Sequence, residues 1–321
     1  MYDVIGDIHG HADALRRLLR ELGYEQGRNG WRHAERKVVF LGDFVDRGPE
    51  IKAVLEIARA MVESGAARAV MGNHEFNAVS FHMPHPTANA GFLRERSYKN
   101  IRQYRETVAQ LTDAELDEAT RWFQTLPMWL DLGELRIVHA CWDPDSMHVV
   151  EQGRERFGGF TDEFFHRACE RDEELFDAVE VLLKGKEARL PDGVSFADND
   201  GHERRAVRTR WYADPRQGSG TYRDYAFSFR ERERDRIPAM PLTKEALEEA
   251  RPYGADDPPV LFGHYWMPGE LEPHPLAANA ACLDYSVARG GRLCAYRWNG
   301  ESNLRADAFV SVPGQAPAPP A

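Results

Sequence analysis

Residues 38–48 read VVFLGDFVDRG, an apolar run that is followed at once by a polar turn. The apolar run at 38–41 is short and ends at a glycine, which predicts a buried strand. Glycine shapes tight turns without steric cost, so we expect the turn to present Asp43, Asp46 and Arg47 together at the end of that strand. The stretch therefore predicts a buried sheet with reactive polar groups at its edge.

Four other short segments place Asp, His or Asn just beyond an apolar run. They are Gly6-Asp7-Ile8-His9-Gly10, Gly72-Asn73-His74-Glu75, His139-Ala140 and Gly263-His264. These side chains are oxygen and nitrogen ligands for divalent metals, and the ends of buried strands can deliver them to one shared site. The alternative is that they are ordinary caps, turn formers and core histidines, which would require five coincidences in order. The five segments therefore predict a metal site.

The first half of the chain alternates strand patterns with helix patterns, which predicts an α/β fold. We expect strands at 2–5, 38–41 and 69–71, and helices at about 12–22 and 51–64. Residues 100–125 are predicted to be helical, with a capping box from Thr112 to Glu115 at the start of a second helix.

Apolar strand patterns return in the second half, at 135–139, 260–262, 281–283 and 293–298. We expect these strands to complete a second sheet, which predicts a two-sheet β-sandwich flanked by helices. Residues 1–312 are interpreted as one catalytic domain, in which the irregular stretch at about 143–258 is an insertion that forms a cap. The Pro- and Ala-rich tail, 313–321, is predicted to be disordered.

Composition limits the classes of partner. The chain has 321 residues, a formal net charge of −11 and four cysteines without Cys-x-x-Cys spacing. Stable nucleic-acid binding needs many Lys and Arg side chains against phosphates, so the acidic balance argues against it. No apolar stretch approaches the roughly 20 residues of a membrane span, and no charged and apolar leader is present. We expect a cytoplasmic protein with reduced thiols, and the sequence leaves its oligomeric state open.

With its five segments the chain resembles the calcineurin-like metallophosphoesterases. The resemblance implies two divalent metal ions that share Asp43 as a bridging carboxylate. It implies Asp7, His9 and Asp43 as ligands of the first metal, and Asp43, Asn73, His139 and His264 as ligands of the second. Manganese is the metal that the family implies, and iron, zinc, cobalt or nickel also suit this ligand set.

The same resemblance implies catalytic roles beside the metals. His74 is expected to act as a general acid on the leaving oxygen, with Asp46 orienting it, because a histidine can change charge near neutral pH. Arg47 is expected to bind the phosphate with its planar fork of donors, next to Asn73. The alternative is that His74, Asp46 and Arg47 are a structural hydrogen-bond cluster that supports the metals.

The last segment, Gly263-His264-Tyr265-Trp266, differs from the Gly-His-x-His of many relatives, because tryptophan cannot coordinate a metal. The chain is therefore similar to the phosphoprotein-phosphatase branch of the superfamily, and most similar to its bacterial diadenosine tetraphosphate hydrolase type. It departs from that type at Asp284-Tyr285-Ser286, where Asp-Thr-Gly is usual, and at Cys141-Trp142, where a glycine is common. Both departures concern the substrate rather than the metals.

The expected function is hydrolysis of phosphate esters or anhydrides by a two-metal mechanism, with nucleoside polyphosphates such as diadenosine tetraphosphate as substrates. A serine/threonine or tyrosine protein phosphatase is the alternative, and a non-catalytic binding protein is a further one. Arg210 is the candidate for an additional phosphate contact. It belongs to a group, Arg204, Arg205, Arg208 and Arg210, that either binds substrate or forms a solvated strand.

Overall fold

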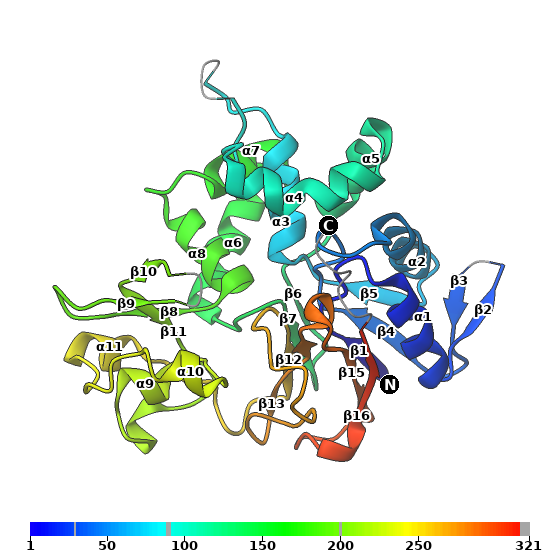
Figure 1. Cartoon of the computed structure of the whole chain (residues 1–321). Coiled ribbons are helices and arrows are strands. Elements are labelled where there is room, and N and C mark those ends of the chain that lie inside the picture. The colour runs from blue at the N-terminus through cyan, green and yellow to red at the C-terminus, as the bar shows by residue number, and fades with distance from the viewer. Residues whose placement is uncertain (29, 88–90, 199–200, 315–321) are drawn as a thin grey trace.

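The computed structural model describes residues 1–28, 30–87, 91–198 and 201–314 (Figure 1). Two sheets and the helices around them share one hydrophobic core, and a smaller group of elements has a core of its own. Among the described helices, none is both long and apolar enough to cross a membrane.

The first sheet is built around the N-terminal strand, β1 (Tyr2–Ile5), which is paired on both sides. β4 (Lys37–Phe40) runs parallel to it, and β15 (Arg292–Trp298) runs antiparallel on the other side. The outer strands are β5 (Ala67–Ala69), β14 (Asp284–Tyr285) and β16 (Phe309–Pro313). The predictions for 2–5 and 38–41 are confirmed to within a residue, and the strand predicted at 69–71 begins two residues earlier.

The second sheet has the order β13-β12-β7-β6. Its strands are β13 (Ala280–Cys282), β12 (Val260–Phe262), β7 (Arg136–Val138) and β6 (Trp129–Asp131). The prediction that 293–298 joins this sheet is wrong, because that segment is β15 and pairs with β1. An apolar pattern reveals that a strand is buried but carries no information about which strand forms its backbone hydrogen bonds. The two-sheet α/β architecture itself is confirmed.

Amphipathic helices cover the sheets (Figure 1). In α1, the buried residues Leu15, Leu18 and Leu19 follow the helical repeat and face the core. The two helices predicted within 100–125 are confirmed as α4 and α5, and the capping box between Thr112 and Glu115 starts the second. The main helices are α1 (Ala12–Glu21), α2 (Ile51–Glu63), α3 (Asn73–His82), α4 (Tyr98–Gln110), α5 (Asp113–Phe123), α6 (Pro144–Phe157), α7 (Asp162–Ala168) and α8 (Glu174–Lys184).

The predicted insertion at 143–258 divides into two parts. Its first part consists of α6, α7 and α8, which pack into the main core. Its second part has a separate small core that includes Val207, Tyr222 and Tyr225. The elements of this second part are β8 (Glu187–Arg189), β9 (Phe196–Ala197), β10 (Glu203–Arg204), β11 (Ala206–Arg208), α9 (Tyr222–Tyr225), α10 (Glu231–Arg234) and α11 (Lys244–Glu249). A capping role for it stays a prediction.

The remaining elements are peripheral. A hairpin of β2 (Glu25–Gly27) and β3 (Gly30–Arg32) extends beyond α1 and α2 (Figure 1). Three 3-10 turns are η1 (Pro215–Gln217), η2 (Val287–Arg289) and η3 (Ala306–Ala308). Of the predicted tail 313–321, Pro313 ends β16, and residues 315–321 lie outside the described part of the chain.

Candidate metal centre

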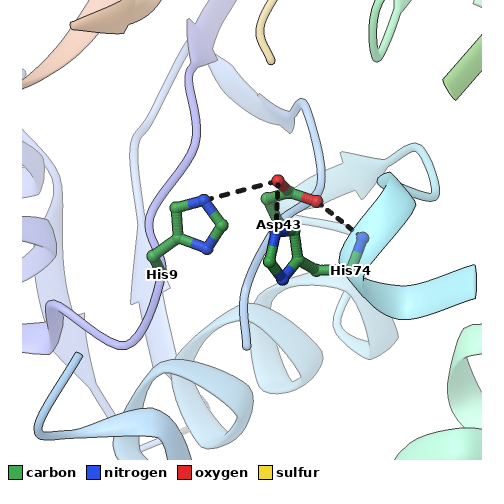
Figure 2. A group of neighbouring side chains, drawn as sticks. All are labelled: His9, Asp43 and His74. Carbon is green, nitrogen blue, oxygen red and sulfur yellow. Dashed lines mark hydrogen bonds and ion pairs between the residues drawn. The ribbon is translucent and has the colours of Figure 1, made fainter. Parts of the chain in front are cut away.

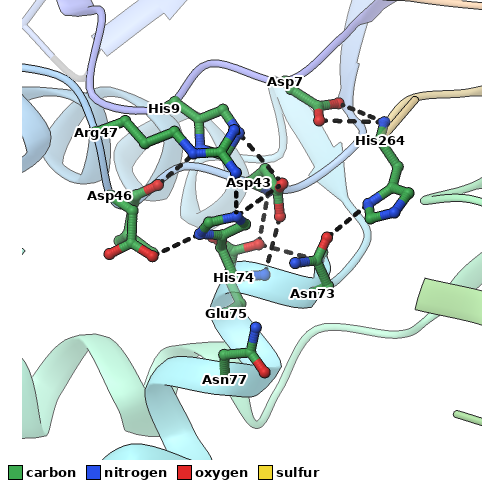
Figure 3. A network of polar contacts seen from close by, with 12 residues as sticks. Asp7, His9, Asp43, Asp46, Arg47, Asn73, His74, Glu75, Asn77 and His264 are labelled. Atoms are coloured by element: carbon green, nitrogen blue, oxygen red, sulfur yellow. Dashed lines mark hydrogen bonds and ion pairs between the residues drawn. The ribbon is translucent and has the colours of Figure 1, made fainter. Parts of the chain in front are cut away.

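Strand ends from both sheets bring the six predicted metal ligands together. Figure 3 labels each of them except His139. The first sheet supplies its ligands after β1 and β4, the second sheet after β7 and β12, and α3 contributes its first residue. All six side chains are buried, with at most 9% of their surface exposed. They are Asp7, His9, Asp43, Asn73, His139 and His264. The structure therefore places these distant segments side by side, and the roles of the six residues as metal ligands stay a prediction.

Asp43 lies at the middle of the cluster (Figure 2). Its Oδ2 is 3.4 Å from Nε2 of His9, and its Oδ1 is 3.6 Å from Nε2 of His139. Two groups of side chains have ligand atoms close enough to share one ion each: His9, Asp43 and His74 form one, and Asp7, Asp43 and His139 form the other. Because Asp43 belongs to both, it is in the position of a bridging carboxylate.

Backbone carbonyls fix the orientation of two of the histidines. Nδ1 of His9 lies 2.9 Å from the carbonyl oxygen of Val45, and Nδ1 of His139 lies 2.7 Å from that of Leu41. A carbonyl only accepts hydrogen bonds, so each Nδ1 carries the proton and donates it. Each Nε2 is thereby left with a lone pair that faces Asp43, which is the arrangement that metal-binding histidines usually have.

Asn73 joins the remaining ligands. Its Oδ1 is 2.7 Å from Nδ1 of His264 and 3.1 Å from Nε2 of His139. The backbone N–H of His264 donates to both carboxylate oxygens of Asp7, at 3.2 and 3.1 Å. The buried Nε2 of His264 has no hydrogen-bond partner among the described residues. A buried nitrogen without a partner is costly, and a metal ion would satisfy it.

Electrostatics point to the same need for cations. Burial raises the pKa of Asp7 well above its ordinary value, and the neighbouring Asp284 and Asp43 raise it further. Burial likewise raises the pKa of Asp43 to about 7. Carboxylates crowded away from water are unfavourable in their charged form unless a cation is present. The donor set, its burial and its crowding therefore fit divalent metal ions.

A second cluster adjoins the first (Figure 3). Nη2 of Arg47 lies 3.1 Å from Nε2 of His74, and Nδ1 of His74 lies 2.5 Å from Oδ2 of Asp46. Arginine can only donate, so Nε2 of His74 accepts and Nδ1 donates its proton to Asp46. Burial lowers the pKa of His74 well below its ordinary value, and Arg47 lowers it further. The neutral ring is thus held between a guanidinium and a carboxylate.

Arg47 also contacts a candidate metal ligand. Its Nη1 lies 3.0 Å from Nε2 of His9, which is the nitrogen that His9 directs toward Asp43. A nitrogen lone pair cannot both bind a metal and accept this hydrogen bond. Metal binding by His9 would therefore release the guanidinium of Arg47 for another acceptor, such as a phosphate oxygen.

Two carboxylates at the site were missed by the sequence reasoning, which quoted both but assigned them no role. Glu75 is fully buried and accepts the backbone N–H groups of Asp43, Phe44 and Gly72, at 2.7, 2.8 and 3.0 Å. It therefore positions the loop that carries the central carboxylate. Two of its partners, Asp43 and Phe44, are more than 30 residues away in the sequence, so only its place in the segment 72–75, next to His74, could have indicated the role.

The other missed residue is Asp284. Its two oxygens accept the N–H groups of Trp266 and Ser286, at 2.8 and 3.0 Å. Asp284 thereby ties the loop of His264 to the strand that ends the first sheet. Its place directly after the buried strand predicted at 281–283 was the available signal.

Backbone strain is concentrated at these loops. Seven non-glycine residues in the described chain have positive φ, and all of them belong to the segments discussed above. They are His9, Asp43, Asp46, Arg47, His264, Trp266 and Ser286. Such conformations cost energy and persist where the surrounding structure holds them, which is common at functional sites. The concentration of strained residues in these segments is what is expected of a functional site.

Arg210 does not join the cluster. Its guanidinium donates to a backbone carbonyl in its own part of the chain, and its role as a substrate contact stays a prediction. Arg204 and Arg205 form ion pairs at the surface. Arg208 lies nearer, because its guanidinium carbon is 6.0 Å from the ring centroid of Tyr265, directly after His264.

Comparison with known proteins agrees with this geometry. The asymmetrical bis(5'-nucleosyl)-tetraphosphatase PrpE of Bacillus subtilis (strain 168) is 32% identical over 149 residues, which cover 43% of this chain and 57% of the relative. The protein of the same name from Halalkalibacterium halodurans is 42% identical over 74 residues, which cover 23% and 30%. The chain thus spans between about a third and about half of the length of these relatives.

A solved structure and a family model complete the comparison. The cold-active protein-tyrosine phosphatase of a psychrophilic Shewanella species has a similar fold, with a TM-score of 0.50 and 14% identity over 95% of this chain and 80% of that one. The family model described as calcineurin-like phosphoesterase matches residues 2–184, more than half of the chain. The chain belongs to the calcineurin-like phosphoesterase family.

Proposed function

We propose that this chain hydrolyses phosphate ester or phosphoanhydride bonds with two divalent metal ions, and that its substrates are nucleoside polyphosphates such as diadenosine tetraphosphate. The observation that carries the proposal is the pair of candidate ligand groups that share Asp43, one of which includes His9 and His74, with Arg47 in contact with both of these histidines. The substrate class is supported by the similarity to the bis(5'-nucleosyl)-tetraphosphatases of Bacillus subtilis and Halalkalibacterium halodurans, which match over part of their length.

Six residues would hold the metals. We assign Asp7, His9 and Asp43 to the first ion, and Asp43, Asn73, His139 and His264 to the second. In the structure the ligand atom of Asp7 lies with those of Asp43 and His139, and that of His9 lies with those of Asp43 and His74, so Asp43 is common to both groups. Asn73 contacts both His139 and His264. When bound, two such ions make a water molecule strongly nucleophilic and neutralise charge on phosphoryl oxygens. Manganese is the metal that we propose, and iron, zinc, cobalt or nickel would suit the same donors.

The chain's own side chains perform the remaining steps. Arg47, released from His9, would hold two oxygens of the phosphoryl group in a planar fork. Asn73, whose Oδ1 lies next to His139 and His264, can donate an amide N–H to the same group. His74 would first take up a second proton at Nε2, once Arg47 has moved to the phosphoryl group, and would then donate that proton to the leaving oxygen. Its ring stays held at Nδ1 by Asp46 at 2.5 Å.

A substrate panel tests the proposal. The protein is stripped of metal, reloaded with Mn²⁺ and given diadenosine tetraphosphate, ATP, phosphoserine, phosphothreonine and phosphotyrosine peptides, and p-nitrophenyl phosphate. We expect the dinucleotide to be cleaved with the highest kcat/KM. Faster release of phosphate from the peptides would instead assign a protein phosphatase. Binding of metal without turnover of any compound would favour a non-catalytic binding protein.

A matched pair of variants tests the centre itself. Asp43→Asn removes the shared carboxylate, and we expect Mn²⁺-dependent turnover to fall at least about 100-fold. Asp172→Asn makes the same chemical change at an exposed carboxylate before α8 and should leave turnover unchanged. Full activity of the Asp43 variant would refute the assignment of the centre.

A further inference from the structure

The indole of Trp266 lies against two guanidinium groups at the edge of the candidate metal centre. The guanidinium carbon of Arg47 is 3.8 Å from the ring centroid, and that of Arg289 is 4.0 Å from it. The ring is also 6.0 Å from the ring of His9, centroid to centroid. Arg289 is therefore a second arginine close to the position where Arg47 would hold a phosphoryl group.

The position of Arg289 is fixed by hydrogen bonds. Arg289 ends the turn η2, and the residue before this turn, Ser286, donates its hydroxyl to the carbonyl of Met267 at 2.7 Å. Asp284 accepts N–H groups from Trp266 and Ser286, so one buried carboxylate holds both segments. These buried hydrogen bonds hold the backbone segments that carry Arg289 and Trp266 next to each other, so the guanidinium is within reach of the indole.

Arg289 has no counter-ion in the described structure. Its side chain is exposed, and within the described residues no carboxylate lies within ion-pair distance of its guanidinium. Most arginines of this chain are paired with a carboxylate. One example is Arg292, three residues after Arg289, which pairs with Glu272. An aromatic face attracts a cation, but it does not neutralise the charge.

Two guanidinium groups on one ring can bind two neighbouring anionic groups. Both guanidinium carbons lie within 4.0 Å of the same centroid, so the charges are less than about 8 Å apart and repel one another. A phosphate monoester held by Arg47 has no second phosphate group that Arg289 could bind. A diphosphate or longer chain places a second anionic group next to the first, within reach of the second arginine.

We propose that Arg289, supported by Trp266, forms a second phosphate subsite that binds the phosphate next to the one under attack. The subsite favours substrates with two or more consecutive phosphates over monoesters. This inference rests on the proposed function and identifies the residue that selects its substrate class.

Binding measurements test the subsite without relying on turnover. The probes are AMP and adenosine 5'-(α,β-methylene)diphosphate, which share one nucleoside and differ by one phosphorus group across a link that cannot be hydrolysed. Calorimetry on the Mn²⁺-loaded full chain gives the affinity ratio of the two probes. We expect the ratio to favour the diphosphate analogue in the wild type and to fall about 10-fold in Arg289→Ala, with Arg289→Lys between them.

Arg20→Ala is the matched control. Arg20 is also exposed and also lies over an indole, at 5.4 Å from the ring centroid of Trp31 in the hairpin β2–β3. The substitution Arg20→Ala removes the same charge and the same kind of stacking as Arg289→Ala, and it should leave the affinity ratio of the two probes unchanged. A melting curve of each variant shows that the fold is retained.

The outcomes separate the two proposals. An unchanged affinity ratio in Arg289→Ala, or equal weakening of both probes, overturns the subsite. Failure of the wild type to cleave any nucleoside polyphosphate overturns the proposed substrate, and the affinity ratio still reports on Arg289 in that case. A ratio that falls equally in Arg20→Ala would show a general effect of charge and would also overturn the subsite.

Discussion

Thr107 in α4 supports the candidate proton donor through Asp46, and its replacement by valine gives a sharp test of the second cluster. The hydroxyl of Thr107 donates to Oδ1 of Asp46 at 2.5 Å and accepts the backbone N–H of Asp46 at 3.0 Å. The other carboxylate oxygen of Asp46 holds His74. Thr107 is 1% exposed, so water cannot replace the hydroxyl. Thr107→Val keeps the shape and removes both hydrogen bonds.

The expected loss of stability in Thr107→Val follows from these two hydrogen bonds. A hydrogen bond to a charged group contributes about 1.5–3 kcal/mol, and leaving the N–H of Asp46 unpaired in the interior costs about 1–3 kcal/mol. The additional buried methyl group returns about 1 kcal/mol. We therefore expect Thr107→Val to lower the free energy of unfolding by about 2–5 kcal/mol. Because the ring of His74 is held less firmly, kcat should also fall about 10- to 100-fold.

Urea denaturation of the metal-free protein, followed by circular dichroism, measures the stability term separately from metal binding. Burial raises the pKa of Asp46 to about 7, so the measurement is made at pH 8, where its carboxylate is ionised. Steady-state kinetics of the Mn²⁺-loaded protein give kcat and KM.

Thr120→Val is the control. Thr120 lies in α5, and its hydroxyl only donates to the carbonyl of Leu116 in the same helix, at 2.9 Å, and to that of Asp117, at 3.2 Å. These carbonyls belong to the helix and do not depend on the hydroxyl, so the change should cost less than about 0.5 kcal/mol. Equal stability of the two valine variants, with unchanged kcat, would refute the reasoning about Asp46.

Three further predictions follow from single contacts. Mn²⁺ at 100 times its Kd should raise the free energy of unfolding of the wild type by about 2.7 kcal/mol, which is measured as a rise in Tm. Asp43→Asn should lose this rise in Tm. Arg36→Met removes a 2.8 Å ion pair with the fully buried Asp3 and should cost about 3 kcal/mol in urea denaturation. Gly263→Ala would place a Cβ 2.1 Å from Oδ1 of Asp7, so the carboxylate must move, and calorimetry should show Mn²⁺ affinity about 10- to 100-fold weaker.

Each of these has a matched control and a contrary outcome. A rise in Tm of Asp43→Asn equal to that of the wild type would contradict the shared carboxylate. Arg305→Met breaks an exposed pair with Asp307 and should cost less than about 1 kcal/mol, so equal costs at Arg36 and Arg305 would contradict the buried pair. Gly218→Ala adds a methyl group with room around it and should leave metal affinity unchanged. If Gly263→Ala also leaves the Mn²⁺ affinity unchanged, the steric argument is contradicted.

Local patterns in the sequence predicted individual elements well. The helix at 113–123 was marked by its own capping residues, Thr112 and Glu115, because the cap is made between residues three positions apart. The strands around 2–5 and 38–41 were marked by apolar runs that end in glycine. The meeting of five segments was also predictable, because strand ends of an α/β sheet gather at one edge.

The pairing of the strands and the contacts that hold the site residues in place could not be predicted in this way. The segment 292–298 pairs with β1 rather than with the second sheet, since backbone hydrogen bonds leave no trace in side-chain pattern. Glu75 and Asp284 act through backbone N–H groups of residues that are 2 to 32 positions away, which any sequence supplies. Arg210 was the candidate from the sequence because it lies in a cluster of arginines, and Arg289 was not considered there, because proximity to the centre is decided in space.

The sequence by itself determined the chemistry of this protein: which donors are present, that they follow buried strands, and that His74, Asp46 and Arg47 accompany them. Only the tertiary structure decided which atoms face one another, including the shared position of Asp43 and the stacking of Arg289 on Trp266. The physical reason is that residue identity sets what a side chain can bind. Its partners depend on long-range packing and backbone pairing, to which every part of the chain contributes.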